Sequence, residues 1–261
     1  MTQDSPRWQL VSASVAGKSH EKQALPCQDA HICRATSDRL IVAIADGAGS
    51  ASLADVGAQL AVKTAVELMA DCLSASEGEP DWNAELLKVV GRTKEAIKAE
   101  AGDRDVPVRE LATTLILGVA TPSAIAVAQV GDGAAVVEDG QGNLIALTTP
   151  ASGEYLNETT FLISPDALET AQVNIWSGTP KYLAMFSDGL QMLALKMPQG
   201  TPHAPFFSPL FQFVETIADR AEAEEQLTAF LRSPRVAERT DDDLTLLLAA
   251  LLPQTENFSR E

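Results

Sequence analysis

Cysteine, histidine and basic residues are all scarce in this 261-residue sequence, and each shortage argues against a class of protein. The three cysteines, Cys27, Cys33 and Cys72, are an odd number without a C-x-x-C pair, which argues against a disulfide framework and against a zinc site. We therefore expect free thiols. Only three histidines are present, at positions 20, 31 and 203, so a multi-histidine metal centre is not indicated either.

Positive charge is the next shortage. Lys and Arg number 19 against 36 Asp and Glu, which gives a formal net charge of −17. Because the basic residues do not cluster, a phosphate backbone would be repelled, and we expect no nucleic-acid partner. The acidic excess is explained by a solvated surface, by carboxylates that gather around divalent cations, or by both.

Long apolar runs are also absent. No segment reaches membrane-spanning length without a charge, and the first seven residues lack the basic and apolar regions of a signal peptide. We expect a cytoplasmic, monomeric protein without a membrane segment. A hydrophobic content of 46% can fill a sizeable core, and no internal repeat or linker divides the chain, so residues 1–261 are predicted to form one domain.

Short apolar runs are plentiful and predict most of the secondary structure. Residues 40–45 form an unbroken apolar run closed by Asp46 and Gly47, which is typical of a strand buried on both faces. From residue 113 to residue 148, short runs separated by turn residues predict an antiparallel meander. Further strands are predicted at residues 8–17, 29–35, 159–163, 172–176, 182–186 and 244–252.

Apolar residues at helical spacing predict three helices, at residues 53–72, 82–101 and 210–232. Residues 17–29 are polar, contain Gly and Pro, and are predicted to form a loop. The order of these elements predicts an α+β fold in which antiparallel sheets lie inside and helices outside.

Four carboxylates occur at the ends of predicted strands. Asp46, Asp132 and Asp188 each end an apolar run and precede glycine, and Asp242 opens the last strand. Hard divalent ions such as Mg²⁺ and Mn²⁺ prefer oxygen ligands held on rigid elements. Asp-Gly is also a common turn signal, and Asp139, followed by Gly140, is expected to be only a hairpin turn.

The residues alone therefore leave two interpretations open. The strand-end carboxylates are either turn residues, as is possible for Asp132 in particular, or the ligands of a convergent metal site. On the second interpretation, a binuclear centre that activates water for phosphoester or amide hydrolysis is the main enzymatic possibility.

An ordered set of motifs resembles the metal-dependent serine/threonine protein phosphatases of the type 2C family. The resemblance covers nearly the whole chain and implies a four-layer α-β-β-α sandwich of two antiparallel sheets flanked by helices. Two Mg²⁺ or Mn²⁺ ions would lie at one end of the sheets. The motifs are Gln28-Asp29, Ala45-Asp46-Gly47-Ala48-Gly49, Leu111-Ala112-Thr113-Thr114, Gln129-Val130-Gly131-Asp132, Phe186-Ser187-Asp188-Gly189 and Asp242-Asp243-Leu244-Thr245.

The resemblance also implies roles for particular residues. Asp46 would bridge both ions, and the carbonyl oxygen of Gly47 would bind one of them. Asp188 and Asp242 would complete the site of the other ion. A hydroxide between the two ions would then attack the phosphorus of phosphoserine or phosphothreonine, without a covalent intermediate.

Two further aspartates have more peripheral roles in this resemblance. Asp132 would hold a third, weaker ion, as in bacterial members of the family. Asp29 would act in the second shell or through a water molecule. The implied substrate is a phosphorylated protein, and the implied partner is a cognate Ser/Thr kinase.

The chain departs from the family pattern at three positions. Ala24 replaces an arginine that grips the substrate phosphate in many members, and Ala48 replaces a histidine found near the leaving group in others. Gln28 replaces an acidic residue, so one ion would depend more on water. Lys22 or His20 could take over the phosphate contact, and His20 is the only nearby histidine that could act as general acid.

These departures keep other functions open. A pseudophosphatase that binds a partner without hydrolysis is one alternative, and a phosphatase of a small phosphorylated metabolite is another. The retained Asp46, Asp188 and Asp242 favour an active enzyme. His31 would share a strand face with Asp29, and a structural role is favoured over a ligand role for it.

Overall fold

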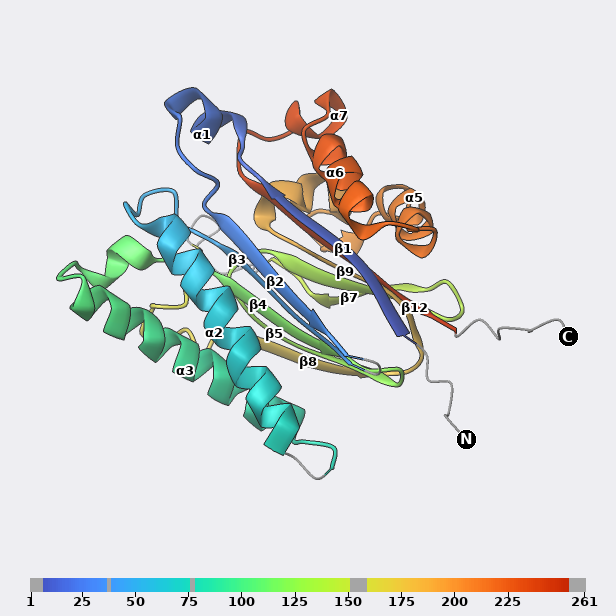
Figure 1. The fold of residues 1–261 in the computed structure, drawn as a ribbon, viewed down its shortest axis with the longest axis horizontal. Helices are drawn as coiled ribbons and strands as arrows, with labels where there is room; N and C mark the ends of the chain where they lie inside the picture. Colours follow the sequence, from blue (N-terminus) through green and yellow to red (C-terminus); the bar gives the residue numbers. More distant parts are fainter. Residues whose placement is uncertain (1–6, 37–38, 76–77, 151–158, 254–261) are drawn as a thin grey trace, which may run out of the picture.

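The computed structural model describes residues 7–36, 39–75, 78–150 and 159–253. Two five-stranded antiparallel sheets form the interior of the molecule (Figure 1). The order of the first sheet is β1 (Arg7–Val15), β12 (Leu244–Leu252), β9 (Pro180–Phe186), β6 (Ala134–Asp139) and β7 (Leu144–Thr148). The order of the second sheet is β2 (Asp29–Ala35), β3 (Leu40–Asp46), β4 (Leu115–Ala120), β5 (Ala124–Val130) and β8 (Gln172–Ser177).

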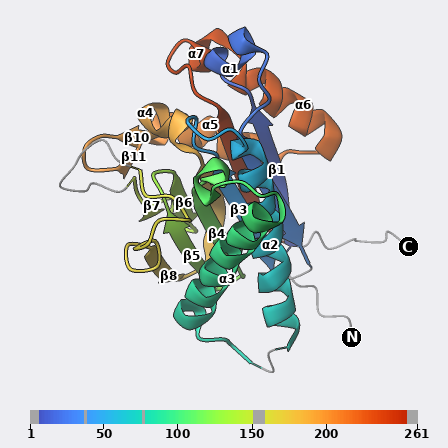
Figure 2. The ribbon, with the colours of Figure 1, turned by 90° about the vertical axis from the view of Figure 1, so that its left-hand side faces the viewer.

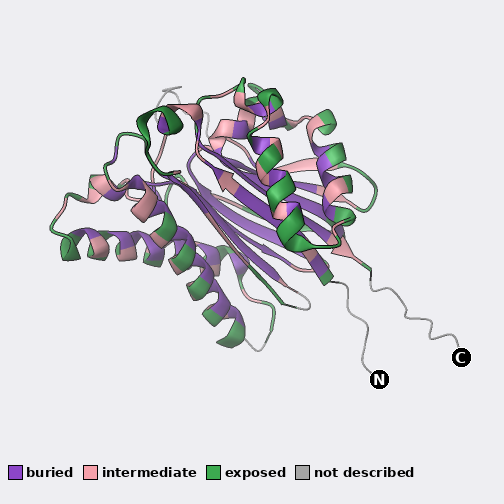
Figure 3. Cartoon of the chain, turned by 45° about the horizontal axis from the view of Figure 1, so that its top comes forward, coloured by how far each residue is buried: buried purple, intermediate pink, exposed green. Residues whose placement is uncertain are grey.

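Helices cover the outer face of each sheet, which confirms the predicted α+β sandwich (Figures 1 and 2). The long helices α2 (Ala54–Ala75) and α3 (Trp82–Asp103) pack on the second sheet. The shorter helices α5 (Ala204–Glu215) and α6 (Arg220–Leu231) pack on the first sheet. In Figure 3 the strands between these helices are almost entirely buried, whereas the helices alternate buried and exposed residues.

The apolar run of β3 is unbroken because both of its faces are buried. Leu40, Val42 and Ile44 pack between the two sheets. Ile41 and Ala43 face the opposite way and pack against the layer that contains α2 and α3. A strand with apolar partners on both sides shows no polar alternation, which explains the sequence pattern.

Four predicted elements differ from the structure. Residues 113–148 do not form one meander, because β5 belongs to the second sheet and β6 to the first, where it pairs with β7 and β9. Residues 159–163 are an irregular turn segment and not a strand. The predicted loop at residues 17–29 contains a short helix, α1 (Lys18–Gln23), whose six residues are too few to show a hydrophobic period.

The predicted helix at residues 210–232 is two helices. The Asp219 side chain accepts a hydrogen bond from the Glu222 backbone N–H at 3.0 Å and starts α6 as its N-cap. The structure also contains small elements that the sequence did not indicate. These are η1 (Val108–Leu111), η2 (Asp188–Leu190), α4 (Gln191–Ala194), β10 (Leu195–Lys196), β11 (Thr201–Pro202) and α7 (Pro234–Ala237).

Two absences apply to the part of the chain that the structure describes. None of the helices there is long and apolar enough to cross a membrane. Cys27, Cys33 and Cys72 are not joined in a disulfide, as the sequence predicted.

Candidate active site

Strand register brings the predicted carboxylates to one end of the sandwich. In the second sheet, Asp29 at the start of β2 lies opposite Asp46 at the end of β3. In the first sheet, Phe186 at the end of β9 pairs with Leu246 of β12 and with Ala134 of β6. The residues just outside these positions, Asp132, Asp188 and Asp242, therefore lie at the same end of the first sheet.

The main chain of Asp46 is held by two threonines that precede β4. Thr113 Oγ1 and the Thr114 backbone N–H donate to the Asp46 carbonyl oxygen at 2.9 and 2.8 Å. The Asp46 N–H donates in turn to Thr114 Oγ1 at 2.9 Å. The Thr113-Thr114 motif thus fixes the strand end that carries Asp46.

Gly47 packs directly against Ala54, the first residue of helix α2. A Cβ atom at this position would come within 2.7 Å of the Ala54 carbonyl oxygen and 2.8 Å of the Ala54 Cβ. A side chain here would therefore push the start of α2 away from Asp46.

The carboxyl groups lie close enough to repel one another. Burial raises the pKa of Asp46 well above its ordinary value, and repulsion from Asp29 and Asp188 adds to this effect. Burial raises the pKa of Asp188 to about 6, and repulsion from Asp132 and Asp242 adds to this effect. A hydrogen bond with the Asp46 carboxyl group acts in the opposite direction. Burial also raises the pKa of Asp242.

Asp29 is buried beside this group and is held by Ser187. Ser187 Oγ donates to Asp29 Oδ2 at 2.7 Å, and Ser187 Oγ also accepts the backbone N–H of Thr245 at 2.9 Å. Burial raises the pKa of Asp29 to about 7, against the opposing effect of the hydrogen bonds from Ser187 and Thr245. A carboxylate in this position is expensive to ionise unless a cation is nearby.

This donor set fits hard divalent cations. Within the described chain, the Oδ1 atoms of Asp29 and Asp188 and the Oε1 atom of Gln28 are buried and accept no hydrogen bond. Oxygen atoms left unpaired among mutually repelling carboxylates are the ligands that Mg²⁺ and Mn²⁺ prefer. Among the described residues, however, no three or more Asp, Glu, His or Cys side chains are already grouped closely enough to hold an ion.

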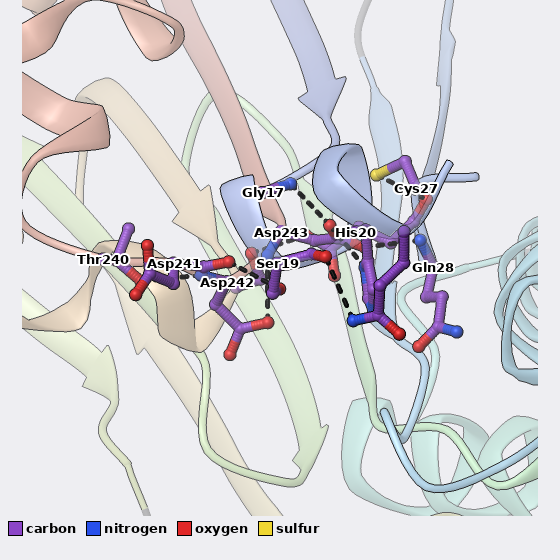
Figure 4. A network of polar contacts seen from close by, with 12 residues as sticks. Gly17, Ser19, His20, Cys27, Gln28, Thr240, Asp241, Asp242 and Asp243 are labelled. Atoms are coloured by element: carbon purple, nitrogen blue, oxygen red, sulfur yellow. Dashed lines mark hydrogen bonds and ion pairs between the residues drawn. The ribbon is translucent and has the colours of Figure 1, made fainter. Parts of the chain in front are cut away.

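Asp243 is a buried acidic residue for which the sequence predicted no separate role. It is 2% exposed, and its Oδ1 atom accepts hydrogen bonds from the Gly17 N–H at 2.7 Å and from His20 Nδ1 at 2.8 Å. Its Oδ2 atom accepts the Gln28 N–H. Figure 4 shows how these contacts join the start of β12 to α1 and to the entry of β2.

Gly17 and His20 have particular reasons to be at this junction. A Cβ atom on Gly17 would lie 2.2 Å from the Asp242 carbonyl carbon, so the two chain segments meet at a glycine. His20 is buried, and its charge interaction lowers the pKa of Asp242. The only sequence signal for this network was the run of three aspartates at positions 241–243, which cannot show which carboxylate faces which way.

The remaining predicted positions are placed as follows. Asp132 accepts a hydrogen bond from Thr159 Oγ1 at 2.7 Å and contributes to the repulsion that raises the pKa values of Asp188 and Asp242.

Lys22 is exposed on α1, and Ala24 ends that helix in the left-handed conformation with φ 53°. His31 Nδ1 lies 2.8 Å from Ser14 Oγ, which agrees with the structural role favoured for it.

Comparison with known proteins identifies relatives that match most of the chain. Residues 16–232 match the family model described as Protein phosphatase 2C. The chain is 39% identical over 251 residues to Serine/threonine-protein phosphatase 3 of Escherichia coli strain K12, which covers 93% of this chain and 98% of that protein.

Solved structures share the fold. The catalytic domain of the serine/threonine protein phosphatase PstP, in complex with two manganese ions, superposes with a TM-score of 0.65 at 17% identity, over 95% of this chain and all of that one. PppA, a regulatory component of the type VI secretion system in Pseudomonas aeruginosa, superposes with a TM-score of 0.64 at 20% identity, over 94% of this chain and 98% of that one.

Proposed function

The chain belongs to the protein phosphatase 2C family and is a serine/threonine protein phosphatase, and we propose that the carboxylate cluster at the end of the sandwich is its active site. The observation that carries this proposal is that Asp46, Asp188 and Asp242, from three separate parts of the chain, lie at one end of the sandwich close enough for their charges to repel, with Asp46 and Asp188 half-buried. Buried like charges are expensive, and they recur where a cation or substrate uses them.

We propose that the cluster holds two Mg²⁺ or Mn²⁺ ions. Asp46 would bridge both ions, the Gly47 carbonyl oxygen would bind one, and Asp188 and Asp242 would bind the other. Asp132 would hold a third, weaker ion, and Asp29 would act from the second shell or through water. When bound, the ions activate a water molecule for attack on phosphorus and neutralise the charge of the phosphate.

The chain itself supplies rigidity and a low-dielectric setting. The hydrogen bonds from Thr113 and Thr114 hold the backbone of Asp46, and Ser187 holds the carboxylate of Asp29. These contacts orient the ligands before a substrate arrives, which lowers the reorganisation needed in the transition state. The burial that raises the carboxyl pKa values also strengthens their attraction to cations.

His20 is our candidate for the proton donor to the leaving serine or threonine oxygen. Its Nδ1 atom lies 2.8 Å from Oδ1 of the buried Asp243 carboxylate, a contact that fixes the orientation of the imidazole ring. Ala48, at the position where other family members carry a histidine, cannot serve this purpose.

The enzyme acts on phosphorylated proteins, and we propose that a cognate Ser/Thr kinase supplies its substrates. We also propose that it works in the cytoplasm, because none of its cysteines is joined in a disulfide and unpaired thiol chemistry of this kind is typical of reducing compartments. The alternatives of a binding-only pseudophosphatase and of a metabolite phosphatase have no observation of their own in their favour.

The decisive test is hydrolysis of a phosphothreonine peptide with Mn²⁺ by the wild type and by Asp46→Asn. We expect metal-dependent turnover that falls by at least about a hundredfold in the variant, because the bridging charge is removed. Asp139→Asn is the matched control, since Asp139 also precedes a glycine but lies in the β6–β7 hairpin. Turnover that survives Asp46→Asn, or that falls equally in Asp139→Asn, would overturn the proposed site.

A further inference from the structure

Residues 159–170 connect the active-site cluster to helix α3. At one end, Thr159 Oγ1 donates a hydrogen bond to Asp132 Oδ2 at 2.7 Å. In the middle, the Leu162 N–H donates to the Thr113 carbonyl oxygen at 2.7 Å, beside the main chain of Asp46. The segment has no regular secondary structure, so its position depends on individual contacts of this kind.

Apolar packing fixes the segment against the long helices. Leu162 and Ala167 are fully buried in the core between the second sheet and helices α2 and α3. Packing of this kind holds the segment on the helices but is not directional, so it does not by itself set the orientation of Thr159.

Lys94 supplies a directional contact. It belongs to the buried face of α3 and is 7% exposed. Its Nζ atom donates to the carbonyl oxygens of Ser164 at 2.5 Å and of Pro165 at 3.3 Å. A lysine on the apolar face of a helix is costly to bury, and here its ammonium group caps two main-chain carbonyls of the irregular segment.

We propose that Lys94 and Thr159 are positioning residues for Asp132. Lys94 fixes the turn at Ser164 and Pro165, the turn fixes the start of the segment, and Thr159 thereby holds the Asp132 carboxylate in the orientation that binds a divalent ion. This inference rests on the proposed function, because it takes Asp132 as a ligand of the weakest ion. It adds two residues outside the carboxylate cluster that set the affinity for that ion.

The test measures Mn²⁺ binding directly by isothermal titration calorimetry on the full-length protein. Thr159→Val keeps the side-chain shape and removes the donor, whereas Thr159→Ser keeps the donor. We expect Thr159→Val to weaken the weakest class of Mn²⁺ site about tenfold, as the loss of an outer-shell partner does, and Thr159→Ser to bind as the wild type does. Unchanged Mn²⁺ affinity in Thr159→Val would overturn the proposal.

Lys94 is tested by Lys94→Met, which keeps the length and apolar stem, with Lys98→Met as control. Lys98 lies on the same helix, but its side chain is 44% exposed and pairs with Glu95. We expect Lys94→Met to weaken the same Mn²⁺ site about tenfold and Lys98→Met to leave it unchanged. If Lys94→Met lowers the melting temperature without changing the Mn²⁺ isotherm, Lys94 is only structural and the proposal fails.

The double variant Lys94→Met/Thr159→Val tests whether the two residues act through one path. We expect it to bind Mn²⁺ no more weakly than Thr159→Val alone, because both changes release the same carboxylate. Additive losses would overturn the shared path. If Lys94→Met does not fold, Lys94→Arg takes its place, and we expect that variant to retain Mn²⁺ affinity because it keeps the charged donor; a tenfold loss in a folded Lys94→Arg protein would contradict the proposal.

Failure of this inference is distinguishable from failure of the proposed function. Asp46→Asn and Asp132→Asn are titrated alongside. If Asp46→Asn abolishes strong Mn²⁺ binding while Asp132→Asn and Thr159→Val bind as the wild type, the active site stands and the positioning of Asp132 falls. If the wild type binds no Mn²⁺, both proposals fall.

Discussion

The two neighbouring aspartates that precede β12 have opposite environments. Asp242 takes part in the repulsion of the carboxylate cluster, whereas both oxygens of Asp243 accept hydrogen bonds from α1 and the segment before β2. Asp243 is therefore a buried charge that is paired within the chain, whereas Asp242 is an exposed charge whose neighbours are mostly like charges. Burial and hydrogen bonding together therefore separate the structural carboxylate of Asp243 from the proposed ligand Asp242.

His20 contacts the buried carboxylate of Asp243 and is also the proposed general acid. The variant His20→Asn separates the structural role from the catalytic one. Asparagine retains a donor for Asp243 but cannot transfer a proton. We expect turnover of a phosphothreonine peptide to fall about a hundredfold, because an alkoxide leaving group needs a proton. We expect an aryl phosphate to be hydrolysed at nearly the wild-type rate, since its phenolate leaves unaided. The measurement is kcat for both substrates at saturating Mn²⁺.

The ratio of the two rates decides the outcome. An equal loss on both substrates would mean that His20 only holds the junction between α1 and β12. Lys22→Asn serves as control, because Lys22 lies exposed on the same helix; it leaves both rates unchanged if Lys22 makes no phosphate contact. A loss that Lys22→Asn shows for both substrates would instead assign the phosphate contact to Lys22.

At the scale of elements, helix α3 ends in a left-handed turn that carries an unfavourable residue. The Asp105 N–H bonds to the Gly102 carbonyl oxygen at 3.1 Å and the Val106 N–H to that of Ala101 at 3.0 Å. This pattern is a Schellman motif, in which glycine is preferred at the position that Asp105 holds with φ 54°. The aspartate also places a negative charge at the C-terminal end of the helix.

Asp105→Gly is therefore expected to raise the free energy of unfolding by about 1 kcal/mol, through loss of the left-handed strain and of the repulsion with the helix dipole. Asp105→Ala removes the charge but keeps a Cβ, so it is expected to be about 1 kcal/mol less stable than Asp105→Gly. Urea unfolding followed by circular dichroism measures both. Equal stability of the glycine and alanine variants would contradict the strain argument.

The elements also show where the sequence was informative. The final strand was predicted at residues 244–252 and occurs there, because seven of its nine residues are buried in the first sheet and all but Thr245 are apolar. The transfer of the chain from β5 to β6 across the sandwich was missed, because a turn between two sheets has the same Gly-Asp-Gly composition as a hairpin within one. Residues 159–163 were misread as a strand because the burial of Phe161, Leu162 and Ile163 comes from contacts with the helices and with the loop after β3, and not from a ladder.

The candidate site was predictable in part for a related reason. Strand-end carboxylates were visible in the sequence because the strands before them are apolar. The contacts of Asp243, Thr159 and Lys94 were not, because each joins segments at least 27 residues apart, and no local pattern records such pairs. Lys94 in particular lies within a predicted helix that carries many charged residues, and its sequence position does not show that it contacts Ser164 and Pro165.

For the molecule as a whole, the carboxylate cluster that is proposed to serve the function lowers the stability of the metal-free fold. The ends of the two sheets hold several carboxylates where they repel one another, so the metal-free fold is less stable than it would be with a neutral residue there. Divalent ions that bind only the folded state reverse this deficit. An ion at a hundred times its dissociation constant adds about 2.7 kcal/mol, and for a chain of this size that corresponds to a rise in Tm of roughly 5–11 °C.

Asp46→Asn is expected to change the melting temperature in opposite directions without and with Mn²⁺, relative to the wild type. Because Asp46 is repelled by Asp29, Asp188 and Asp242, its replacement by a neutral amide is expected to raise the Tm of the metal-free protein. The same change removes the proposed bridging ligand, so Mn²⁺ is expected to raise the Tm of the variant by less than half as much as that of the wild type. Differential scanning calorimetry with EDTA and with Mn²⁺ measures both effects, and Asp139→Asn, outside the cluster, should follow the wild type. A variant that is stabilised by Mn²⁺ as strongly as the wild type would show that the ions bind elsewhere.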